Sequence, residues 1–499
     1  MLENVTIGII CDIHLPNHKE SPQYAFLKLA ANKMKKDGIQ TVICLGDISS
    51  YGQVEAWELY RELFDSFEHY EVVGNWDVSD PSTRDTILEY AQRCEFSIGS
   101  RRIIGINTLD AQISESDKAY LENVKAGDIL FMHHYIRSMK RESGQWLTRL
   151  AERVPITILH GHGHRVFDYM IGDSRVLGMR GLDPDKVVGG FPSISYLHVS
   201  QDEVTLEEHS FPLPKAYLED TSRYFGISCV DNQLDVTYAA EHNVKYVELR
   251  CNGGDWKPDM ELLPTLEDWR TKTNGYLSVH MPNVYFRNGE LQGREKWFDA
   301  MSYAITVKAD GLTIHPPRAS VSAMKKDGDV WNQFLELYVT VAKSVPPTTK
   351  IGIENLHKNS GEPLDENRGF GYRPEEVTAW IEAINEKLGQ QRVGHVLDVG
   401  HARNNGAFSE QYPLSTWYHL MGRKTVAYHI HQVISNDIEI LNHNAIESWF
   451  GPLINYTAFF YAWHEDVLNH VPVFLEVKGH KHFETSMVAF QELLKELSI

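Results

Sequence analysis

The feature that most constrains this chain is an apolar run, Ile7–Cys11, that leads directly into Asp12 and His14. If the run is a buried strand that continues to His14, its period of two places both polar side chains on the same side of the strand end. Later apolar runs also end in side chains able to bind a metal ion: Cys44-Leu45-Gly46-Asp47, Val73-Gly74-Asn75-Trp76-Asp77, Met132-His133-His134 and Ile158 to His164. The repetition predicts a metal site built from several strand ends.

Strand-like runs and helical patterns alternate through the first 210 residues. Helical spacing is found over 23–36 and 55–67, and strand candidates lie at 7–14, 41–45, 71–73, 102–106, 128–132, 156–159, 193–199 and 203–206. This alternation, with a strand pair at the end, predicts an α/β domain with a mixed sheet covered by helices. The polar residues at the strand ends then lie along one rim of the sheet.

The donors at these strand ends suit a pair of divalent ions. Nitrogen and oxygen ligands without thiolate fit Mn, Fe, Zn, Co or Ni, and the sequence does not choose among them. Two ions bridged by one carboxylate, for which Asp47 is the natural candidate, activate a water and hold both oxygens of a phosphoryl displacement. One ion is expected to take Asp12, His14 and His164, and the other Asn75, His133 and His162.

In this order the motifs resemble those of the calcineurin-like metallophosphoesterases over about the first 200 residues. The resemblance implies an αββα sandwich with two divalent ions that hydrolyses a phosphoester. One position departs from the pattern, because many members carry His directly after the Asn, where it protonates the leaving group or contacts phosphate. Here that residue is Trp76.

An indole is not a useful proton donor, so Trp76 favours phosphodiesters with good leaving groups over monoesters. His134 and His160 are the substitute acids, His134 being the catalytic candidate beside Asp47, although a packing role is the stronger interpretation for both. Asn75 and Trp76 are expected to contact substrate. The alternative is that this domain, or the second one, is catalytically silent and serves as a binding or regulatory module.

A Pro-flanked segment, Phe211–Lys215, follows the last strand pair. Two prolines around Leu213 disfavour regular structure there. We therefore predict a domain at residues 1–215 and a second at 222–499.

The second half repeats a strand-then-helix pattern. Strand candidates lie at 225–230, 244–249, 276–280, 311–315, 350–354, 393–398, 425–431 and 473–477, and helical patterns at 234–241, 296–308, 330–342, 374–387 and 491–497. Eight such units in about 275 residues predict a (β/α)₈ TIM barrel.

Function in such barrels sits at the C-terminal strand ends. These strands end in Glu248, His280, His315, Glu354, Asp398 with His401, His429 with His431, and Glu476. At least one divalent ion (Mn, Zn, Co or Mg) is expected on Glu354, Asp398, Glu476 and one of His429 or His431. Spacing cannot decide between the two histidines, and His431 is slightly preferred. Other histidines are interpreted as surface or packing residues: His242, His357, His395, His443, His464 and His470.

The phrases around Glu354, Asp398 to His401, His429 to His431 and Glu476 resemble the xylose-isomerase-like barrels. That superfamily includes sugar and sugar-phosphate isomerases and epimerases. By this resemblance Glu354 and Glu476 are the acid/base pair, and the substrate contacts are Glu248, His280, His315 and His401. The rival branch is the metal-dependent apurinic endonucleases, in which His280 and His315 stand where ligands of a multi-metal cluster would come.

Composition and net charge disfavour some classes of binding partner. A net charge of −20 disfavours nucleic acid, which needs a basic face. Five cysteines without paired spacing indicate free thiols in a reducing compartment, and no apolar stretch is long enough for a membrane helix. We expect a cytoplasmic enzyme for a small-molecule phosphoester and a sugar or sugar phosphate, with no membrane contact and with a homo-oligomer left open.

Overall fold

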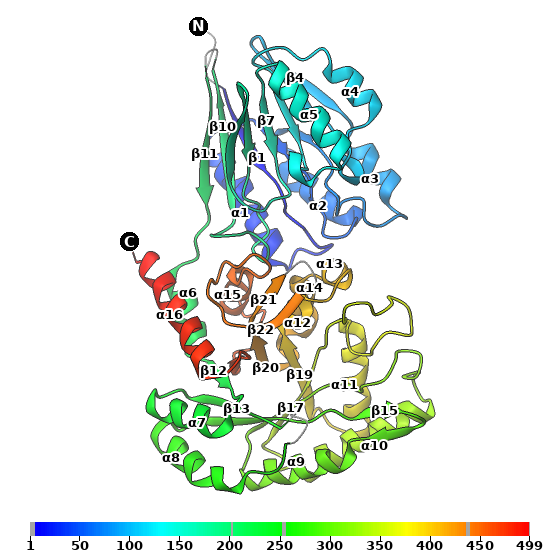
Figure 1. Cartoon of the computed structure of the whole chain (residues 1–499), viewed down its shortest axis with the longest axis vertical. Coiled ribbons are helices and arrows are strands. Elements are labelled where there is room, and N and C mark those ends of the chain that lie inside the picture. The colour runs from blue at the N-terminus through cyan, green and yellow to red at the C-terminus, as the bar shows by residue number, and fades with distance from the viewer. Residues whose placement is uncertain (1–4, 201–202, 252–255, 436–439, 499) are drawn as a thin grey trace. The chain divides into compact units, whose positions relative to one another are not determined.

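The computed structural model describes residues 5–200, 203–251, 256–435 and 440–498, and the chain divides into two compact units. The first unit comprises Met1–Leu213 with Asn455–Ala458, and the second comprises Pro214–Ile454 with Phe459–Ile499. Figure 1 labels the elements of both units. None of the helices in the described ranges combines the length and the apolar character that crossing a membrane requires.

Two sheets build the first unit. In one, the order is β11-β10-β1-β2-β3, with β1 (Val5–Ile10), β2 (Thr41–Cys44) and β3 (Glu68–Glu71) parallel, and β10 (Ser193–Val199) and β11 (Val204–Ser210) added antiparallel. The other has the order β4-β5-β6-β7-β9-β8 and consists of β4 (Cys94–Ile98), β5 (Arg101–Gly105), β6 (Ile129–Met132), β7 (Thr157–His160), β8 (Phe167–Ile171) and β9 (Ser174–Gly178).

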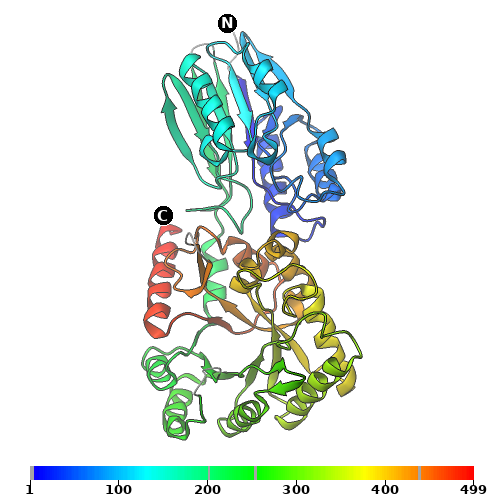
Figure 2. The same cartoon turned by 45° about the vertical axis from the view of Figure 1, so that its right-hand side comes forward.

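Helices cover the outer faces of the two sheets. On the first sheet, α1 (Pro22–Lys36), α2 (Val54–Phe64) and α3 (Arg84–Tyr90) bury residues such as Leu27 and Trp57. On the second, α4 (Glu115–Leu121) and α5 (Arg141–Arg153, cyan in Figure 2) bury Leu150. Apolar residues from both sheets, including Ile9 and Ile129, meet between them. This four-layer arrangement confirms the αββα sandwich.

Three details of the first unit differ from the sequence pattern. The prediction of a single mixed sheet is wrong, because the chain enters a second sheet at β4. The pattern also misses β4, β8 and β9. In β4 and β8 half-buried and exposed positions alternate, so residues such as Glu95 and Asp168 interrupt the apolar run. A strand through His14 is wrong as well, since β1 ends at Ile10.

The second unit is a closed barrel of eight parallel strands. They are β12 (Phe225–Ser228), β13 (Tyr246–Arg250), β14 (Tyr276–His280), β17 (Gly311–Ile314), β18 (Lys350–Glu354), β19 (Val393–Asp398), β20 (Thr425–Ile430) and β23 (Val473–Leu475), and β12 pairs with β23 to close the ring. Each overlaps one strand expected from the sequence, so the predicted (β/α)₈ barrel is confirmed.

Helices surround this barrel on the outside (Figures 1 and 2). The main ones are α7 (Asn232–Glu241), α8 (Leu263–Thr273), α9 (Arg294–Thr306), α10 (Asp329–Ser344), α11 (Pro374–Leu388), α14 (Leu414–Met421), α15 (Thr457–His464) and α16 (His480–Glu496), with the short α6 (Lys215–Ser222), α12 (Val399–Arg403) and α13 (Phe408–Gln411) between them. Two hairpins, β15 (Tyr285–Arg287) with β16 (Glu290–Gln292) and β21 (Gln432–Ser435) with β22 (Ile440–Asn444), follow strands β14 and β20.

Ile129 tests the core between the two sheets. It is fully buried on β6 among apolar residues of both sheets, so Ile129→Ala removes buried methylenes and leaves a cavity. We expect a loss of about 2–5 kcal/mol in the stability of the first unit, seen as a lower midpoint in thermal unfolding. Leu29→Ala, at a side chain that is 45% exposed on α1, is the control and should change stability by less than about 0.5 kcal/mol. Equal effects of the two variants would contradict this core.

Candidate metal centres

Loops that follow the strand ends carry the polar residues of the first unit. Asp12 follows β1, Asp47 follows β2, and His133 follows β6. Five of these residues, Asp12, His14, Asp47, His162 and His164, have φ between 47° and 63°. This left-handed conformation costs a non-glycine residue roughly 1–3 kcal/mol and persists only where the surroundings enforce it. The side chains therefore converge through strained loops, and not through the period of a strand.

Gly74 allows two of these loops to approach each other. A Cβ atom built at this position would lie 2.1 Å from Asp47 Oδ1 and 2.5 Å from the Asp47 amide nitrogen. Only a residue without a side chain leaves room for the Asp47 carboxylate there.

The Asp47 carboxylate lies between two groups of donors. Its Oδ2 is 3.2 Å from His133 Nε2 and 3.8 Å from His14 Nε2. On the first side, His133 Nε2 is 3.1 Å from both Asn75 Oδ1 and His162 Nδ1. On the other side, donor atoms of Asp12, His14 and His164 all lie within 4.8 Å of one another. The structure thus brings together all seven residues that the sequence assigned to the two ions.

Burial and imidazole neighbours set the charges in this cluster. Burial raises the pKa of Asp12 to about 7. Burial alone would also raise the pKa of Asp47, but His133 and the other imidazoles outweigh it and hold that pKa well below its usual value. Burial lowers the pKa of His133, yet Asp47 reverses the effect and raises it to about 9.

Several atoms of the cluster are buried without a hydrogen-bond partner among the described residues. They are His14 Nε2, Asp47 Oδ2 and His164 Nδ1. A buried polar atom without a partner costs free energy, so such atoms mark a place for an additional group. A carboxylate oxygen between imidazole nitrogens is a donor set that fits divalent ions.

Trp76 and His134 lie at different places around the cluster. The Trp76 amide donates a 2.9 Å hydrogen bond to Asp47 Oδ1, and its half-buried ring has a centroid 5.8 Å from Nζ of Lys186, the lysine that contacts His14. His134 places its ring centroid 4.6 Å from that of His162, and its Nδ1 is 2.9 Å from Thr108 Oγ1. Burial lowers the pKa of His134 to about 3.

Two supporting residues were not singled out from the sequence. Asp77 accepts hydrogen bonds from the amides of Ser49 and Gly74 and from Trp57 Nε1, which ties its own loop to the loop after β2 and to α2. Its position in the Gly74-Asn75-x-Asp77 motif was a usable signal. Lys186 places its Nζ 3.3 Å from His14 Nδ1, and nothing in the local sequence marks it.

The second unit gathers its polar residues at the C-terminal ends of the barrel strands. Glu248, His280, Glu354, Asp398 and His429 belong to β13, β14, β18, β19 and β20 themselves. The remaining members, His315, His401, His431 and Glu476, follow strand ends, and all nine are buried or nearly so.

Glu354 lies at the centre of this second cluster. Its Oε2 is 3.1 Å from His280 Nε2 and 3.2 Å from His315 Nε2. Its Oε1 is 3.3 Å from His401 Nδ1 and 3.4 Å from His429 Nδ1. One carboxylate is therefore shared by imidazoles from four positions around the barrel.

Asp398 and Glu476 extend the cluster on either side. Asp398 Oδ2 is 3.2 Å from His401 Nδ1, and its Oδ1 is 3.3 Å from His431 Nε2. Glu476 Oε2 is 3.2 Å from His429 Nδ1. His429, and not the slightly preferred His431, thus lies between Glu354 and Glu476.

His443 is a correction to the sequence analysis. It was interpreted as a surface or packing residue, but its Nδ1 lies 3.5 Å from Glu476 Oε2. Its ring centroid is also 4.6 Å from that of His431. His443 lies on β22, between the barrel strands β20 and β23 and outside any strand of the barrel, so the strand-end rule could not find it.

Glu248 has a different environment from the other acids. Ser278 Oγ and Thr313 Oγ1 donate to its Oε2 at 3.2 and 2.6 Å, and Ser228 Oγ donates to its Oε1. The same Oε1 lies 2.9 Å from His429 Nε2. Hydroxyl groups thus satisfy Glu248, which in turn orients His429.

Unpartnered atoms mark this cluster too. Glu354 Oε1, Asp398 Oδ2 and Glu476 Oε2 are buried and accept no hydrogen bond from the described parts of the chain. The imidazoles, with His315 and His429 foremost, outweigh burial and hold the pKa of Glu354 well below its ordinary value. Three ionised carboxylates beside imidazoles again fit divalent cations.

The first unit is thus a two-sheet sandwich whose strand-end loops converge on the Asp47 carboxylate. Residues 5–190 match the family model of the calcineurin-like phosphoesterases. The family implies divalent metal ions, and the donor set described above fits them. No curated protein matches the chain.

Solved structures resemble one half of the chain each. A dimetal phosphatase from Danio rerio has 12% identity and a TM-score of 0.35, and covers 41% of this chain and 96% of its own. A D-tagatose 3-epimerase-like protein has 18% identity and a TM-score of 0.39, and the match covers 55% of this chain and 100% of that protein. A xylose isomerase-type protein from Rhodospirillum rubrum has 14% identity and a TM-score of 0.41, and the match covers 54% of this chain and 98% of that protein.

Gly74→Ala tests the close approach in the first cluster. Because the new methyl group would overlap Asp47 Oδ1, we expect the Asp47 carboxylate to move and the Mn²⁺ retained by the first unit to fall at least about tenfold. The control is Gly38→Ala, where nothing lies within 4 Å and only the φ of +76° costs about 1–2 kcal/mol. Elemental analysis after dialysis measures the difference, and equal metal contents would contradict the assignment.

Proposed function

We propose that the domain at residues 1–215 hydrolyses a phosphodiester with two divalent ions. The observation that carries this proposal is the Asp47 carboxylate, whose Oδ2 faces His133 on one side and His14 on the other. A single oxygen between two donor groups is what bridging of two ions requires. The match to the calcineurin-like phosphoesterase model supports the reaction class.

The residues divide the work as follows. Asp12, His14 and His164 hold one ion, Asn75, His133 and His162 hold the other, and Asp47 serves both. Divalent ions in this place supply an activated water and neutralise charge on the phosphoryl group. Asn75 and Trp76 line the approach of substrate, and Asp77 keeps the Asn75 loop in position through its bond from the Gly74 amide.

The proposed preference of this domain for phosphodiesters rests on Trp76. Its ring has no group that can protonate an alkoxide. His134, which lies beside His162, is the side chain we assign to the leaving group, but its pKa of about 3 leaves it a neutral imidazole. Substrates whose leaving group needs little protonation are therefore favoured.

Asp47→Asn tests this proposal. The amide keeps the size of the side chain but loses the charge that bridges two cations, so we expect hydrolysis of bis(p-nitrophenyl) phosphate to fall at least about 100-fold, together with the metal content. Asp65→Asn, at an exposed position after α2, is the matched control. Unchanged hydrolysis and metal content in Asp47→Asn would show that this domain is not a dinuclear phosphoesterase.

For the domain at residues 222–499 we propose a metal-dependent isomerase or epimerase of a sugar or sugar phosphate. The supporting observation is the arrangement of Glu354 and Glu476, which approach His429 Nδ1 to 3.4 and 3.2 Å. Glu354, Asp398, His429 and Glu476 would hold one divalent ion, which stabilises an oxyanion next to the carbon that loses a proton. Glu354 and Glu476 move that proton, and Glu248 keeps His429 oriented.

A second candidate, a phosphoester hydrolase with several ions, is favoured by one feature of the same cluster. His280 and His315 both approach Glu354 Oε2, the oxygen that faces away from His401 and His429. On the opposite side, donor atoms of His401, His431 and His443 lie within 4.8 Å of one another. Two further groups of ligands thus flank the first.

Glu354→Gln separates the barrel chemistry from that of the sandwich. We expect the barrel to lose its ion and its activity at least about 100-fold, while hydrolysis by the sandwich stays unchanged, because the two donor sets share no residue. Glu336→Gln, at an exposed side chain of α10, is the control. Exchange of a carbon-bound proton with D₂O, followed by NMR, measures isomerisation. Release of phosphate in an Asp47→Asn background measures hydrolysis by the barrel, and this outcome selects the second candidate.

We also propose a cytoplasmic location and small-molecule substrates. All five cysteines are free thiols, which supports a reducing compartment. The net charge of −20 supports partners other than nucleic acid.

A further inference from the structure

A pocket of about 400 Å³ lies at the loops that follow strands β14, β17 and β18 of the barrel. Its lining combines aromatic rings and guanidinium groups: Tyr285, Phe286, Phe370, Tyr372, Arg287 and Arg318. The volume is in the range of small-molecule sites. None of these residues belongs to the metal cluster described above.

The backbone around Arg318 is fixed on both sides. The Phe286 amide donates to the Arg318 carbonyl at 3.1 Å, and the Phe370 amide donates to the Ala319 carbonyl at 3.0 Å. Isolated bridges join Tyr285 to Arg318 and Ser320 to Gly369. The backbone of Arg318 therefore lies between two other chain segments that are hydrogen-bonded to it or to the residues next to it, and these bonds hold its Cα in place.

The Arg318 side chain connects the pocket to the metal cluster. Its Nε donates to Asn283 Oδ1 at 3.0 Å, and the same oxygen lies 2.7 Å from His315 Nδ1. His315 Nε2 is in turn 3.2 Å from Glu354 Oε2. A ligand group on Arg318 is thus only one amide and one imidazole away from the central carboxylate.

The lining carries two guanidinium groups and one carboxylate, and the arginines are not paired with it. Within the described ranges, neither Arg318 nor Arg287 has a carboxylate within ion-pair distance, although the chain carries a net charge of −20. The one carboxylate in the lining, Glu362, already accepts from Tyr372 Oη, the Asn359 amide and the Gly369 amide. A half-buried guanidinium without an acid is a ready partner for an anion.

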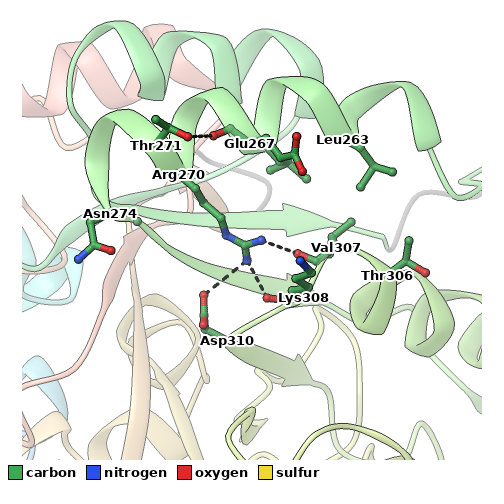
Figure 3. A pocket seen from close by; sticks show the side chains of 11 residues that line it. Leu263, Glu267, Arg270, Thr271, Asn274, Thr306, Val307, Lys308 and Asp310 are labelled. Atoms are coloured by element: carbon green, nitrogen blue, oxygen red, sulfur yellow. Dashed lines mark hydrogen bonds and ion pairs between the residues drawn. The ribbon is translucent and has the colours of Figure 1, made fainter.

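The pocket in Figure 3 shows the opposite situation. It is larger, about 580 Å³, and contains Arg270, which reaches from α8 toward the end of α9. Arg270 donates to the carbonyls of Val307 and Lys308 at 2.8 and 2.7 Å and lies 3.7 Å from Asp310 Oδ2. The guanidinium of Arg270 is therefore already paired with groups of the chain, at the N-terminal ends of β14 and β17. A larger volume alone does not make this pocket an anion-binding site.

We propose that the pocket around Arg318 binds the phosphate group of a phosphorylated sugar, with Arg287 as a second cationic contact and the aromatic rings against the sugar. Planar guanidinium groups pair with phosphate oxygens through two parallel hydrogen bonds. This proposal rests on the barrel function proposed above, and it assigns the substrate class as a sugar phosphate and not a free sugar.

Binding by calorimetry on the intact, metal-containing chain tests the proposal. The probes are D-ribose 5-phosphate and D-ribose, which differ only in the phosphate. We expect Arg318→Ala to weaken the affinity for the ester at least about tenfold, to leave any binding of D-ribose unchanged, and to leave the metal content unchanged. Arg318→Lys, which keeps the charge, should recover part of the loss.

Two further variants separate a local role from a general one. Arg287→Ala, which contacts no residue of the metal cluster, should also weaken binding of the ester, and Arg270→Gln should not. The proposal would be overturned if Arg318→Ala weakened the affinity for the ester and for the free sugar equally. It would also be overturned if Arg318→Ala or Arg287→Ala left the affinity for the ester unchanged, or if the wild-type chain did not bind the ester. Binding of an abasic-site duplex through Arg318 without binding of the ester would overturn the small-molecule class.

The outcomes also distinguish this proposal from the barrel function. Ester binding that depends on Arg318, without isomerisation or phosphate release, supports the pocket and contradicts the proposed reaction. Isomerisation of a free sugar that is unaffected by Arg318→Ala supports the reaction and contradicts the pocket.

Discussion

Both units depend on one constraint, which is that ionised carboxylates are buried at the carboxyl ends of parallel strands. Asp47 is 1% exposed and Glu354 is fully buried. An unpaired carboxylate in such a place costs several kcal/mol, so the fold must supply positive or polarisable neighbours. In the first unit His133, which follows β6 of the second sheet, lies 3.2 Å from Asp47, which follows β2 of the first sheet. In the barrel His280 on β14 lies 3.1 Å from Glu354 on β18, two strands further around the ring. Parallel barrel strands meet this requirement because their carboxyl ends share one edge.

This constraint explains how much of the structure the sequence could predict. The barrel strands are buried on both faces, so each appears as an apolar run with a polar residue at its end, and all eight were located. The same signal located Asp47 and the six other ligand candidates around it. It failed where strands are half exposed, as in β4 and β8, and where the chain changes sheets, because neither event alters the apolar pattern.

The remaining site residues are positioned by contacts that are distant in sequence. Lys186 reaches His14 across 172 positions, and Arg318 reaches His315 only through Asn283 on a different loop. His443 joins the cluster from a hairpin that is not part of the barrel. Local periodicity carries no information about such contacts, since a lysine or arginine in a loop has the same sequence neighbourhood whether it is solvated or held at a site.

The two clusters achieve convergence in different ways, and the difference has a physical consequence. In the sandwich, five of the polar residues adopt left-handed φ values, and Gly74 provides the space for Asp47. In the barrel, Glu354, Asp398 and His429 stand on strands, and ladder hydrogen bonds to their neighbours fix them. Strain in the first cluster must be offset by what it binds and by bonds such as those to Asp77, whereas the barrel cluster is held by the same pairing that closes the ring. The barrel rim therefore provides a fixed frame, to which the Arg318 side chain is connected through Asn283 and His315.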